Sequence, residues 1–306
     1  MNKVIVVAGA TGNLGFRIIK ALIANGGADV RAVVRHSSST QKISTLEKLG
    51  VKVLAVNMNN VEEVTKACEG VSCVVSALAG LRDTIIDTQK VLLDAAVNAG
   101  VPRFIPSDFS LDFTNLVDGK NRNLDLRREF HQYLDQKNIK ATTIFNGPFT
   151  DLLTNQMPMI LFKFHKVLYW GNANQKMDFT TMDDTAAFTA KVAVDEISPR
   201  FLRIAGDQLN VKEIANIMTQ LSGKKHGLIK AGSVGFLNIM IKIGKTFAPA
   251  EDDLYPAWQG MQYMRDMVEG RVDISEHDNN RYPEIKWTSI KDVLSKHLSN
   301  IKNVSE

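Results

Sequence analysis

The sequence contains few cysteines and no long uninterrupted hydrophobic run. Cys68 and Cys73 are the only cysteines, and a single C-x4-C pair lacks the second pair that a structural zinc site needs. The most apolar later stretch, residues 234–247, is interrupted by Lys242 and Lys245. It is also shorter than the ~20 residues that span a bilayer. The sequence therefore predicts no disulfide scaffold, no metal site and no transmembrane helix.

A strong charge of one sign is also absent. The 37 Lys and Arg residues exceed the 33 Asp and Glu residues only slightly, giving a formal charge of +4, too mild and dispersed to indicate a nucleic-acid groove. This basic excess is compatible with a small partner that carries phosphate. Lys3 and the apolar residues 4–8 resemble a signal peptide only faintly, because the run is short and leads directly into a glycine motif. We expect a leaderless, reduced, cytoplasmic protein that binds neither nucleic acid nor membrane.

The composition and the hydrophobic pattern favour an α/β fold with two coupled halves. A chain of 306 residues with 44% hydrophobic and 23% charged residues is a globular protein near the upper size for one core. Apolar β-branched runs alternate with segments of helical spacing, which predicts a doubly wound parallel sheet. The predicted strands cover residues 4–8, 30–34, 51–56, 71–77, 103–106 and 141–146, and the predicted helices cover 16–23, 41–49, 61–68, 84–98 and 121–137.

The pattern changes after Gly147-Pro148-Phe149. We predict a nucleotide-binding domain over residues 1–150 and a smaller substrate-binding region over 151–306, part of which returns to the sheet. Within the second region we expect a hairpin around residues 171–174 and helices near 183–194 and 211–222. Nine of the eleven methionines lie at or beyond position 157, which fits either ordinary core packing or an adaptable apolar surface.

A glycine-rich motif lies between the first predicted strand and the first predicted helix, where a dinucleotide fingerprint must lie to function. Gly9 permits a sharp turn, Gly12 lets the backbone approach a pyrophosphate, and Gly15 allows the helix to pack closely on the strand. The helix N-terminus then faces the anion. The predicted pyrophosphate-binding residues are Gly9, Thr11, Gly12, Asn13, Leu14 and Gly15.

The end of the second strand indicates which cofactor is bound. A carboxylate there bonds the ribose 2′-hydroxyl of NAD, whereas an arginine accommodates the 2′-phosphate of NADP. Here Arg35 is followed by His36 and three serines, Lys42 lies one turn into the next helix, and no acidic residue occurs between Arg31 and Lys42. The sequence predicts NADP(H), bound through Arg35 and Lys42.

Further candidate residues follow the later strands, because open α/β sheets bind ligands at the carboxyl ends of their strands. The Ser107 hydroxyl can bond the nicotinamide ribose or a substrate oxygen, and the Phe149 ring can cover the nicotinamide. A structural cap or turn is the alternative role at each position. The candidates are Ser76, Ala77, Leu78, Ser107, Asn146 and Phe149.

With these residues in place, the chain resembles the NmrA-like, isoflavone-reductase-like branch of the atypical short-chain dehydrogenases. The resemblance implies a Rossmann domain with a smaller C-terminal substrate domain and NADPH as hydride donor. It also implies aromatic, phenylpropanoid-type alcohols, ethers or carbonyls as substrates; a similar bacterial subgroup is labelled aromatic alcohol reductase. The stretches that carry it are residues 9–15, 34–35, 104–109 and 171–176 leading into Asp183-Asp184.

The sequence departs from this family at the catalytic position. Its reductases carry a lysine four residues before a paired arginine, and the pair Arg127-Arg128 places Asn123 there. Lys120 lies about one turn earlier and is a candidate replacement, with a solvated loop lysine as the alternative. Lys120, Asn123 and Ser107 are therefore the catalytic candidates, together with a water relayed through the ribose.

Tyr133 and Lys137 match the Tyr-x-x-x-Lys of ordinary short-chain dehydrogenases. The helix runs away from the catalytic edge of the sheet, so Tyr133, ten residues beyond Asn123, lies ~15 Å farther down. We interpret Tyr133 as a packing residue. His165 and His226 show no metal-ligand spacing and are interpreted as structural or exposed.

Three functions remain open. The leading hypothesis is an NADPH-dependent reductase, monomeric or homodimeric, that transfers hydride to a small aromatic substrate. The alternative is a non-catalytic NADP(H)-binding redox sensor, which the asparagine at position 123 favours. A nucleotide-sugar epimerase or dehydratase ranks last, because it needs a catalytic tyrosine near the start of the helix that contains Tyr133.

Overall fold

The computed structural model describes residues 3–272 and 276–305. The chain forms two compact units whose segments interleave along the sequence. Unit one comprises residues 1–109, 123–145 and 185–202, and unit two comprises 110–122, 146–184 and 203–306. The division at residue 150 stays a prediction, but residues beyond it do belong to the unit that contains the first strands.

Unit one is built on a parallel sheet of six strands in the order β3-β2-β1-β4-β5-β6. The order reverses beside β1, where β1 pairs with β2 on one side and β4 on the other, with Ile5 opposite Val30 and Cys73. A reversal of this kind is where open α/β sheets bind their ligands. The strands are β1 (Lys3–Ala8), β2 (Ala28–Arg35), β3 (Lys52–Val56), β4 (Cys73–Ser76), β5 (Arg103–Ile105) and β6 (Lys140–Ala141).

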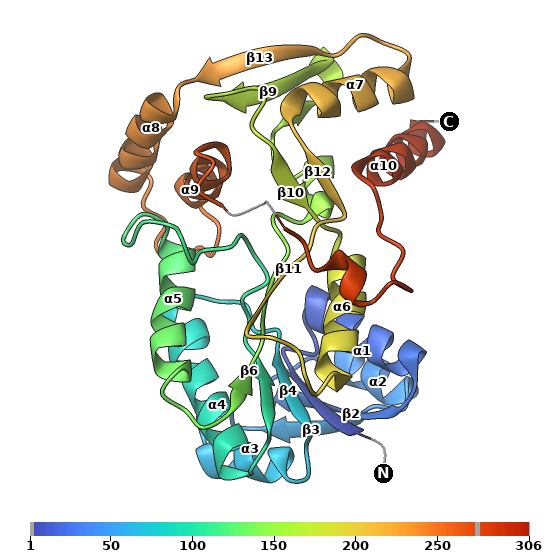
Figure 1. The fold of residues 1–306 in the computed structure, drawn as a ribbon, viewed down its shortest axis with the longest axis vertical. Coiled ribbons are helices and arrows are strands. Elements are labelled where there is room, and N and C mark those ends of the chain that lie inside the picture. Colours follow the sequence, from blue (N-terminus) through green and yellow to red (C-terminus); the bar gives the residue numbers. More distant parts are fainter. Residues whose placement is uncertain (1–2, 273–275, 306) are drawn as a thin grey trace. The chain divides into compact units, whose positions relative to one another are not determined.

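Helices cover both faces of this sheet, as Figure 1 shows for α1 and α2 on one face and α3, α4 and α5 on the other. Apolar residues of α3, α4 and α5 join those of β1 and β4 in one buried cluster that includes Val6, Val74, Leu92 and Phe130. The doubly wound α/β fold is therefore confirmed. The helices are α1 (Asn13–Asn25), α2 (Thr40–Lys48), α3 (Val61–Cys68), α4 (Gln89–Asn98), α5 (Arg122–Leu134) and α6 (Met182–Val194).

Two predicted elements of this part of the chain differ in detail. The helix expected over 84–98 begins as a π-helical segment, η1 (Asp83–Thr88), before α4. The strand expected over 141–146 is divided into β6 and β7 (Thr143–Phe145), and β7 pairs with β11 (Phe201–Arg203) in a separate sheet. The sequence pattern does not reveal this division, because pairing partners are distant in the chain.

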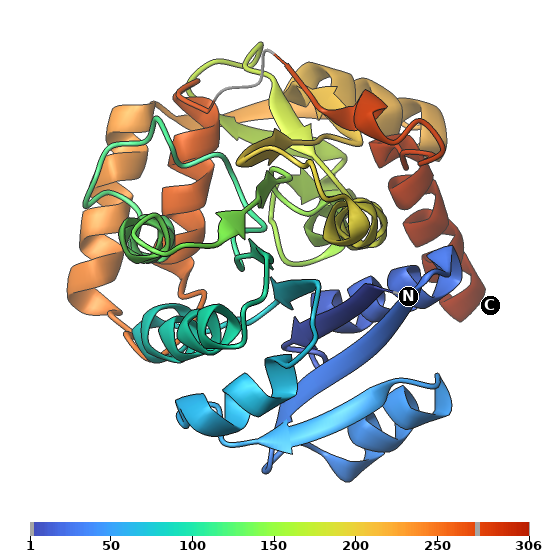
Figure 2. The same ribbon diagram turned by 60° about the horizontal axis from the view of Figure 1, so that its bottom comes forward.

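Unit two combines small sheets with helices. The three-stranded sheet has the order β13-β9-β8, and β10 pairs with β12. Helices α8 and α9 lie side by side (Figures 1 and 2), with Gly244 facing Trp258. The elements are β8 (Ile160–Leu161), β9 (Lys166–Trp170), β10 (Met177–Phe179), β12 (Asp207–Leu209), β13 (Gly227–Gly232), α7 (Val211–Ser222), α8 (Val234–Phe247), α9 (Ala257–Val268) and α10 (Ile290–Ser305), with the short 3-10 segments η2 (Thr150–Thr154), η3 (Phe162–Phe164) and η4 (Asn279–Arg281).

The hairpin predicted around residues 171–174 is wrong. Gly171 does adopt a left-handed conformation, and a turn follows it. However, the strands on either side of this turn belong to different sheets: β9 pairs with β8 and β13, and β10 pairs with β12. Long-range partners outcompete the local pairing. The helices predicted near 183–194 and 211–222 are confirmed as α6 and α7, and α7 begins with an Asn210–Glu213 capping box.

Within the described residues, none of the helices has both the length and the apolar character needed to cross a membrane. Over residues 3–272 and 276–305, no group of three or more His, Cys, Asp or Glu side chains is arranged to hold a metal ion. Cys68 and Cys73 are free and buried, and burial raises the pKa of each thiol to about 12. Both thiols therefore stay protonated and poorly nucleophilic near neutral pH.

Candidate functional site

The glycine motif of unit one forms a tight turn that leaves no room for side chains at two positions. A Cβ atom on Gly9, whose φ is +80°, would lie 2.3 Å from the carbonyl oxygen of Ala77. A Cβ atom on Gly15 would lie 2.3 Å from the carbonyl oxygen of Gly9. The turn is closed by the Gly12 amide, which donates to the Gly9 carbonyl at 2.9 Å. The first loop therefore packs directly against the loop after β4.

Helix α1 begins immediately after this turn, with Gly12 as its N-cap. Among the described residues no side chain caps it, and no acidic residue lies in its first turn. The free N–H groups of Asn13, Leu14 and Gly15 therefore lack the capping oxygen that many helices supply. A helix start without acidic residues suits a phosphate group, because the N-terminus carries partial positive charge.

Basic side chains lie at the end of β2 and in α2, the helix that follows it. The Arg35 side chain is exposed and has no hydrogen bond or ion pair in the described part of the chain. Lys42 donates from Nζ to the carbonyl oxygen of Thr11 at 3.0 Å, which joins α2 to the glycine loop. One residue here escaped the sequence interpretation: Glu63 lies 3.7 Å from His36 and accepts the Asn57 amide at 2.8 Å. It comes from α3, so no local pattern could reveal it.

The loops after β4 and β5 are joined by hydrogen bonds. The Ser107 hydroxyl donates to the carbonyl oxygen of Leu78 at 2.6 Å, and the Ser107 amide donates to Gln89 Oε1 at 2.9 Å. Ser76 is fully buried, and its Oγ has no hydrogen-bond partner among the described residues. The structure therefore brings Gly9, Ala77, Leu78 and Ser107 together at the carboxyl edge of the sheet.

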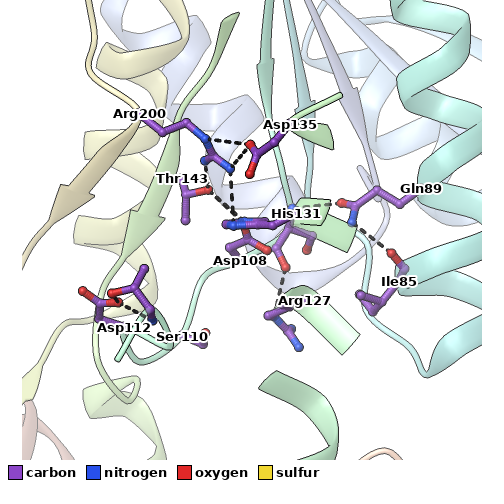
Figure 3. A network of polar contacts seen from close by, with 12 residues as sticks. Ile85, Gln89, Asp108, Ser110, Asp112, Arg127, His131, Asp135, Thr143 and Arg200 are labelled. Carbon is purple, nitrogen blue, oxygen red and sulfur yellow. Dashed lines mark hydrogen bonds and ion pairs between the residues drawn. The ribbon is translucent and has the colours of Figure 1, made fainter. Parts of the chain in front are cut away.

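Asp108 and His131 form a buried polar cluster next to Ser107, shown in Figure 3. Complete burial raises the pKa of Asp108, but His131, Arg127 and the Thr143 hydroxyl together outweigh burial, so this pKa lies below its ordinary value. Asp108 remains ionised near neutral pH. The sequence interpretation missed His131, 23 residues away from Asp108, because nothing local links them.

Asn146 and Phe149 belong to unit two. Asn146 is fully buried; its Nδ2 donates to the Gly147 carbonyl at 2.8 Å, and its Oδ1 has no hydrogen-bond partner in the described residues. The Asn146 carbonyl accepts the Thr180 hydroxyl at 2.6 Å. Phe149 is half-buried and forms a bridge with Thr180. The two predicted residues therefore share Thr180, and Asn146 keeps one acceptor available.

Lys120 also belongs to unit two, and its backbone is fixed by α9. The Lys120 carbonyl accepts Arg265 at 3.0 Å, and the neighbouring Asn121 donates to Asp266 Oδ2 at 2.7 Å and accepts Gln259 Nε2 at 2.8 Å. The Lys120 side chain is exposed and forms no ion pair in residues 3–272 and 276–305. The backbone of Lys120 is therefore held while its amine stays available.

Comparison with known proteins identifies the family of this chain. The model of the NmrA-like family matches residues 1–255. The chain belongs to the NmrA-like family. Among curated relatives, it is 25% identical to pinoresinol reductase 1 of Arabidopsis thaliana over 96% of both chains. It is also 25% identical to the bifunctional pinoresinol-lariciresinol reductase of Linum usitatissimum, over 96% of this chain and 98% of the relative.

Solved structures agree on the fold. The structure of AtPrR2 with NADP+ and (+)pinoresinol has a TM-score of 0.79 at 23% identity and covers 97% of this chain and 99% of that one. The crystal structure of isoflavone reductase has a TM-score of 0.80 at 23% identity, with the same coverage. At this identity the likeness supports the NmrA-like fold and nothing finer. The family resemblance seen in the sequence is confirmed.

Asn123 lies at the position where the family resemblance implied a lysine. Its side chain is only 1% exposed, and its backbone carbonyl accepts Arg127 Nη1 at 2.8 Å. Asn123 belongs to unit one and Lys120 to unit two. The catalytic roles of both residues stay predictions.

Tyr133 lies at the end of α5 and contacts α4, and its role as a packing residue stays a prediction. Its hydroxyl donates to Asp94 at 2.7 Å, and Lys137 pairs with the same carboxylate at 2.7 Å while lying 4.2 Å from the centre of the Tyr133 ring. These contacts join the end of α5 to α4. Among the histidines, His226 is buried and donates from Nδ1 to the Lys224 carbonyl at 2.9 Å, with the His165 ring 5.1 Å away.

Proposed function

We propose that this protein is an NADPH-dependent reductase that transfers hydride to a small aromatic substrate of phenylpropanoid type. The observation that carries the proposal is the glycine turn of unit one, where side chains at Gly9 and Gly15 would strike backbone atoms at 2.3 Å. Among the described residues, no side chain caps the helix start that follows this turn, and Lys42 of α2 donates to the Thr11 carbonyl in the turn. The named activities of the curated relatives supply the reaction and the substrate class.

The residues present fit NADP(H). The first-turn amides of α1 would hold the pyrophosphate, and Gly12 would allow the backbone to approach it. Arg35 has no competing carboxylate partner in the described residues, so its guanidinium is available for the 2′-phosphate. Ser76 Oγ and Asn146 Oδ1 are buried polar atoms without partners in the described chain, as expected of groups that complete their hydrogen bonds with a ligand.

The bound cofactor supplies the hydride, and the chain supplies orientation and a proton. The Ser107 hydroxyl proton is committed to the Leu78 carbonyl, because a carbonyl oxygen only accepts. Ser107 therefore acts as an acceptor that orients a ligand hydroxyl. Lys120 is the proposed proton donor, since its amine is exposed, unpaired within the described chain and carried by a backbone that α9 holds.

The direct test is NADPH oxidation, followed at 340 nm, with (+)-pinoresinol and simpler phenylpropanoid alcohols and aldehydes as probes. The wild-type protein should bind NADPH more tightly than NADH and reduce at least one probe. Tighter binding of NADH would overturn the assignment of NADPH.

Lys120→Met tests the proton donor, with Lys242→Met on the exposed face of α8 as the matched control. Loss of a positioned general acid costs on the order of 10²–10⁴-fold in kcat. Lys120→Met should show such a loss with unchanged NADPH affinity, while Lys242→Met behaves like the wild type. Equal kcat in both variants would contradict the role of Lys120.

A redox sensor is the second candidate, and the observation that favours it is Asn123, a buried amide in place of the family lysine. A sensor would bind NADPH and NADP+ with different affinities and oxidise NADPH with none of the probes. That combination would replace the reductase proposal.

A further inference from the structure

Ser107 is held on three sides by hydrogen bonds within unit one. Its hydroxyl donates to Leu78, its amide donates to Gln89 Oε1, and its carbonyl accepts Arg127 Nε at 3.1 Å. Gln89 is itself fixed, because its Nε2 donates to the Ile85 carbonyl at 3.1 Å (Figure 3). With its own proton directed to Leu78, the Ser107 oxygen offers lone pairs to a donor on a ligand.

The next residue, Asp108, anchors this segment through its side chain. Its Oδ2 lies 2.6 Å from His131 Nε2 and accepts the Thr143 hydroxyl at 2.9 Å. Asp108 is fully buried and His131 is 7% exposed, so both contacts are shielded from water. Figure 3 shows the three side chains pointing toward one another from the loop after β5, from α5 and from β7.

Arg200 determines which nitrogen of His131 carries the proton. Its Nη2 lies 3.3 Å from His131 Nδ1, and its Nη1 donates to Thr143 Oγ1 at 2.8 Å. A guanidinium group only donates, so Nδ1 accepts and the imidazole proton is on Nε2, facing Asp108. The ring therefore links the buried carboxylate to an arginine that also pairs with Asp135 at 3.0 Å.

We infer that Asp108 and His131 are positioning residues that fix the Ser107 oxygen as the acceptor for a hydroxyl group of the nicotinamide ribose. This inference rests on the proposed binding of NADP(H). Rotation of the peptide between Ser107 and Asp108 is restricted, because the Asp108 side chain is anchored and the Ser107 carbonyl accepts Arg127 Nε. The Ser107 hydroxyl is hydrogen-bonded to the loop after β4, and that loop packs against Gly9. Gly9 lies at the reversal of strand order, where a dinucleotide crosses the sheet.

The test compares, by calorimetry, the affinities of two ligands that occupy different parts of the proposed cofactor site. NADPH probes the whole site, and adenosine 2′,5′-bisphosphate probes only the adenine half. The variants are Ser107→Ala, His131→Leu, which removes the donor to Asp108, and His131→Gln, which keeps an N–H donor on a side chain of similar reach. Thr143→Val removes a second donor to Asp108 and supplies the test if His131→Leu does not fold.

Ser107→Ala and His131→Leu should each weaken NADPH binding by about tenfold, the value of one neutral hydrogen bond, and leave the bisphosphate affinity unchanged. His131→Gln should restore most of the NADPH affinity. If His131→Leu, or Thr143→Val in its place, weakens both ligands equally or neither, Asp108 and His131 only stabilise the fold and the inference is overturned. Wild-type protein that binds the bisphosphate but not NADPH refutes the proposed function itself, and this inference with it.

Discussion

Two glycines in the same turn should respond to alanine in opposite ways. A Cβ atom on Gly15 would lie 2.3 Å from the Gly9 carbonyl oxygen and 2.8 Å from its carbon, and both are backbone atoms that cannot rotate away. A Cβ atom on Gly12 would lie 3.1 Å from the same oxygen, at a φ of −82° and ψ of 167° that alanine adopts readily. The first substitution should disturb the fold and the second should not.

The magnitudes follow from these distances. Forcing a methyl group into closely packed surroundings costs typically ~1–3 kcal/mol, and Gly15→Ala belongs at the upper end because backbone must move. Gly12→Ala needs a shift of a few tenths of an ångström, and the lower entropy of the unfolded chain returns ~0.4–1 kcal/mol. Its free energy of unfolding should therefore stay within about 1 kcal/mol of the wild type.

Gly12→Ala should weaken NADPH binding strongly, although it changes the free energy of unfolding little. The added methyl group occupies the approach of the pyrophosphate, and loss of one hydrogen bond to a charged group costs ~1.5–3 kcal/mol, or roughly 10- to 150-fold in Kd. Urea unfolding and NADPH calorimetry measure the two quantities separately. The reasoning is refuted if Gly12→Ala binds NADPH like the wild type, or if Gly15→Ala unfolds at the wild-type urea concentration.

Three other substitutions test individual side chains. Arg35→Ser should weaken NADPH binding by roughly 10- to 100-fold without changing NADH binding, because only NADPH has the 2′-phosphate; equal losses for both cofactors would contradict this. Tyr133→Phe removes the hydrogen bond to Asp94 and should lower stability by about 1 kcal/mol while kcat is unchanged; a large fall in kcat would make Tyr133 catalytic. The pKa of Asp108 is lower in the folded protein than its ordinary value of 3.8, so its contribution to stability is present above that value and lost as the pH falls through the folded-state pKa. The difference in free energy of unfolding between wild type and Asp108→Asn should therefore shrink below about pH 4 in urea titrations. A difference independent of pH would contradict the lowered pKa of Asp108.

Features set by neighbouring residues could be predicted from the sequence. The turn from Gly9 to Gly15 is one example, because its geometry depends on a few consecutive backbone angles. The alternation of strands and helices is another, and it predicted the parallel sheet. The setting of Tyr133 also followed from sequence, since the rise of a helix fixes how far a residue lies from the helix start.

Features that depend on distant partners could not be predicted in this way. Residues 171–174 have the composition of a hairpin turn, but the adjacent strands pair with partners that only the tertiary fold supplies. The buried cluster around Asp108 likewise joins His131 and Arg200, separated from each other by 69 residues. The sequence by itself determined the sheet, the glycine turn and the basic strand end, because local backbone geometry and hydrophobic period encode them. Only the tertiary structure decided which buried polar groups meet, because hydrogen bonds between distant segments leave no periodic pattern in the chain.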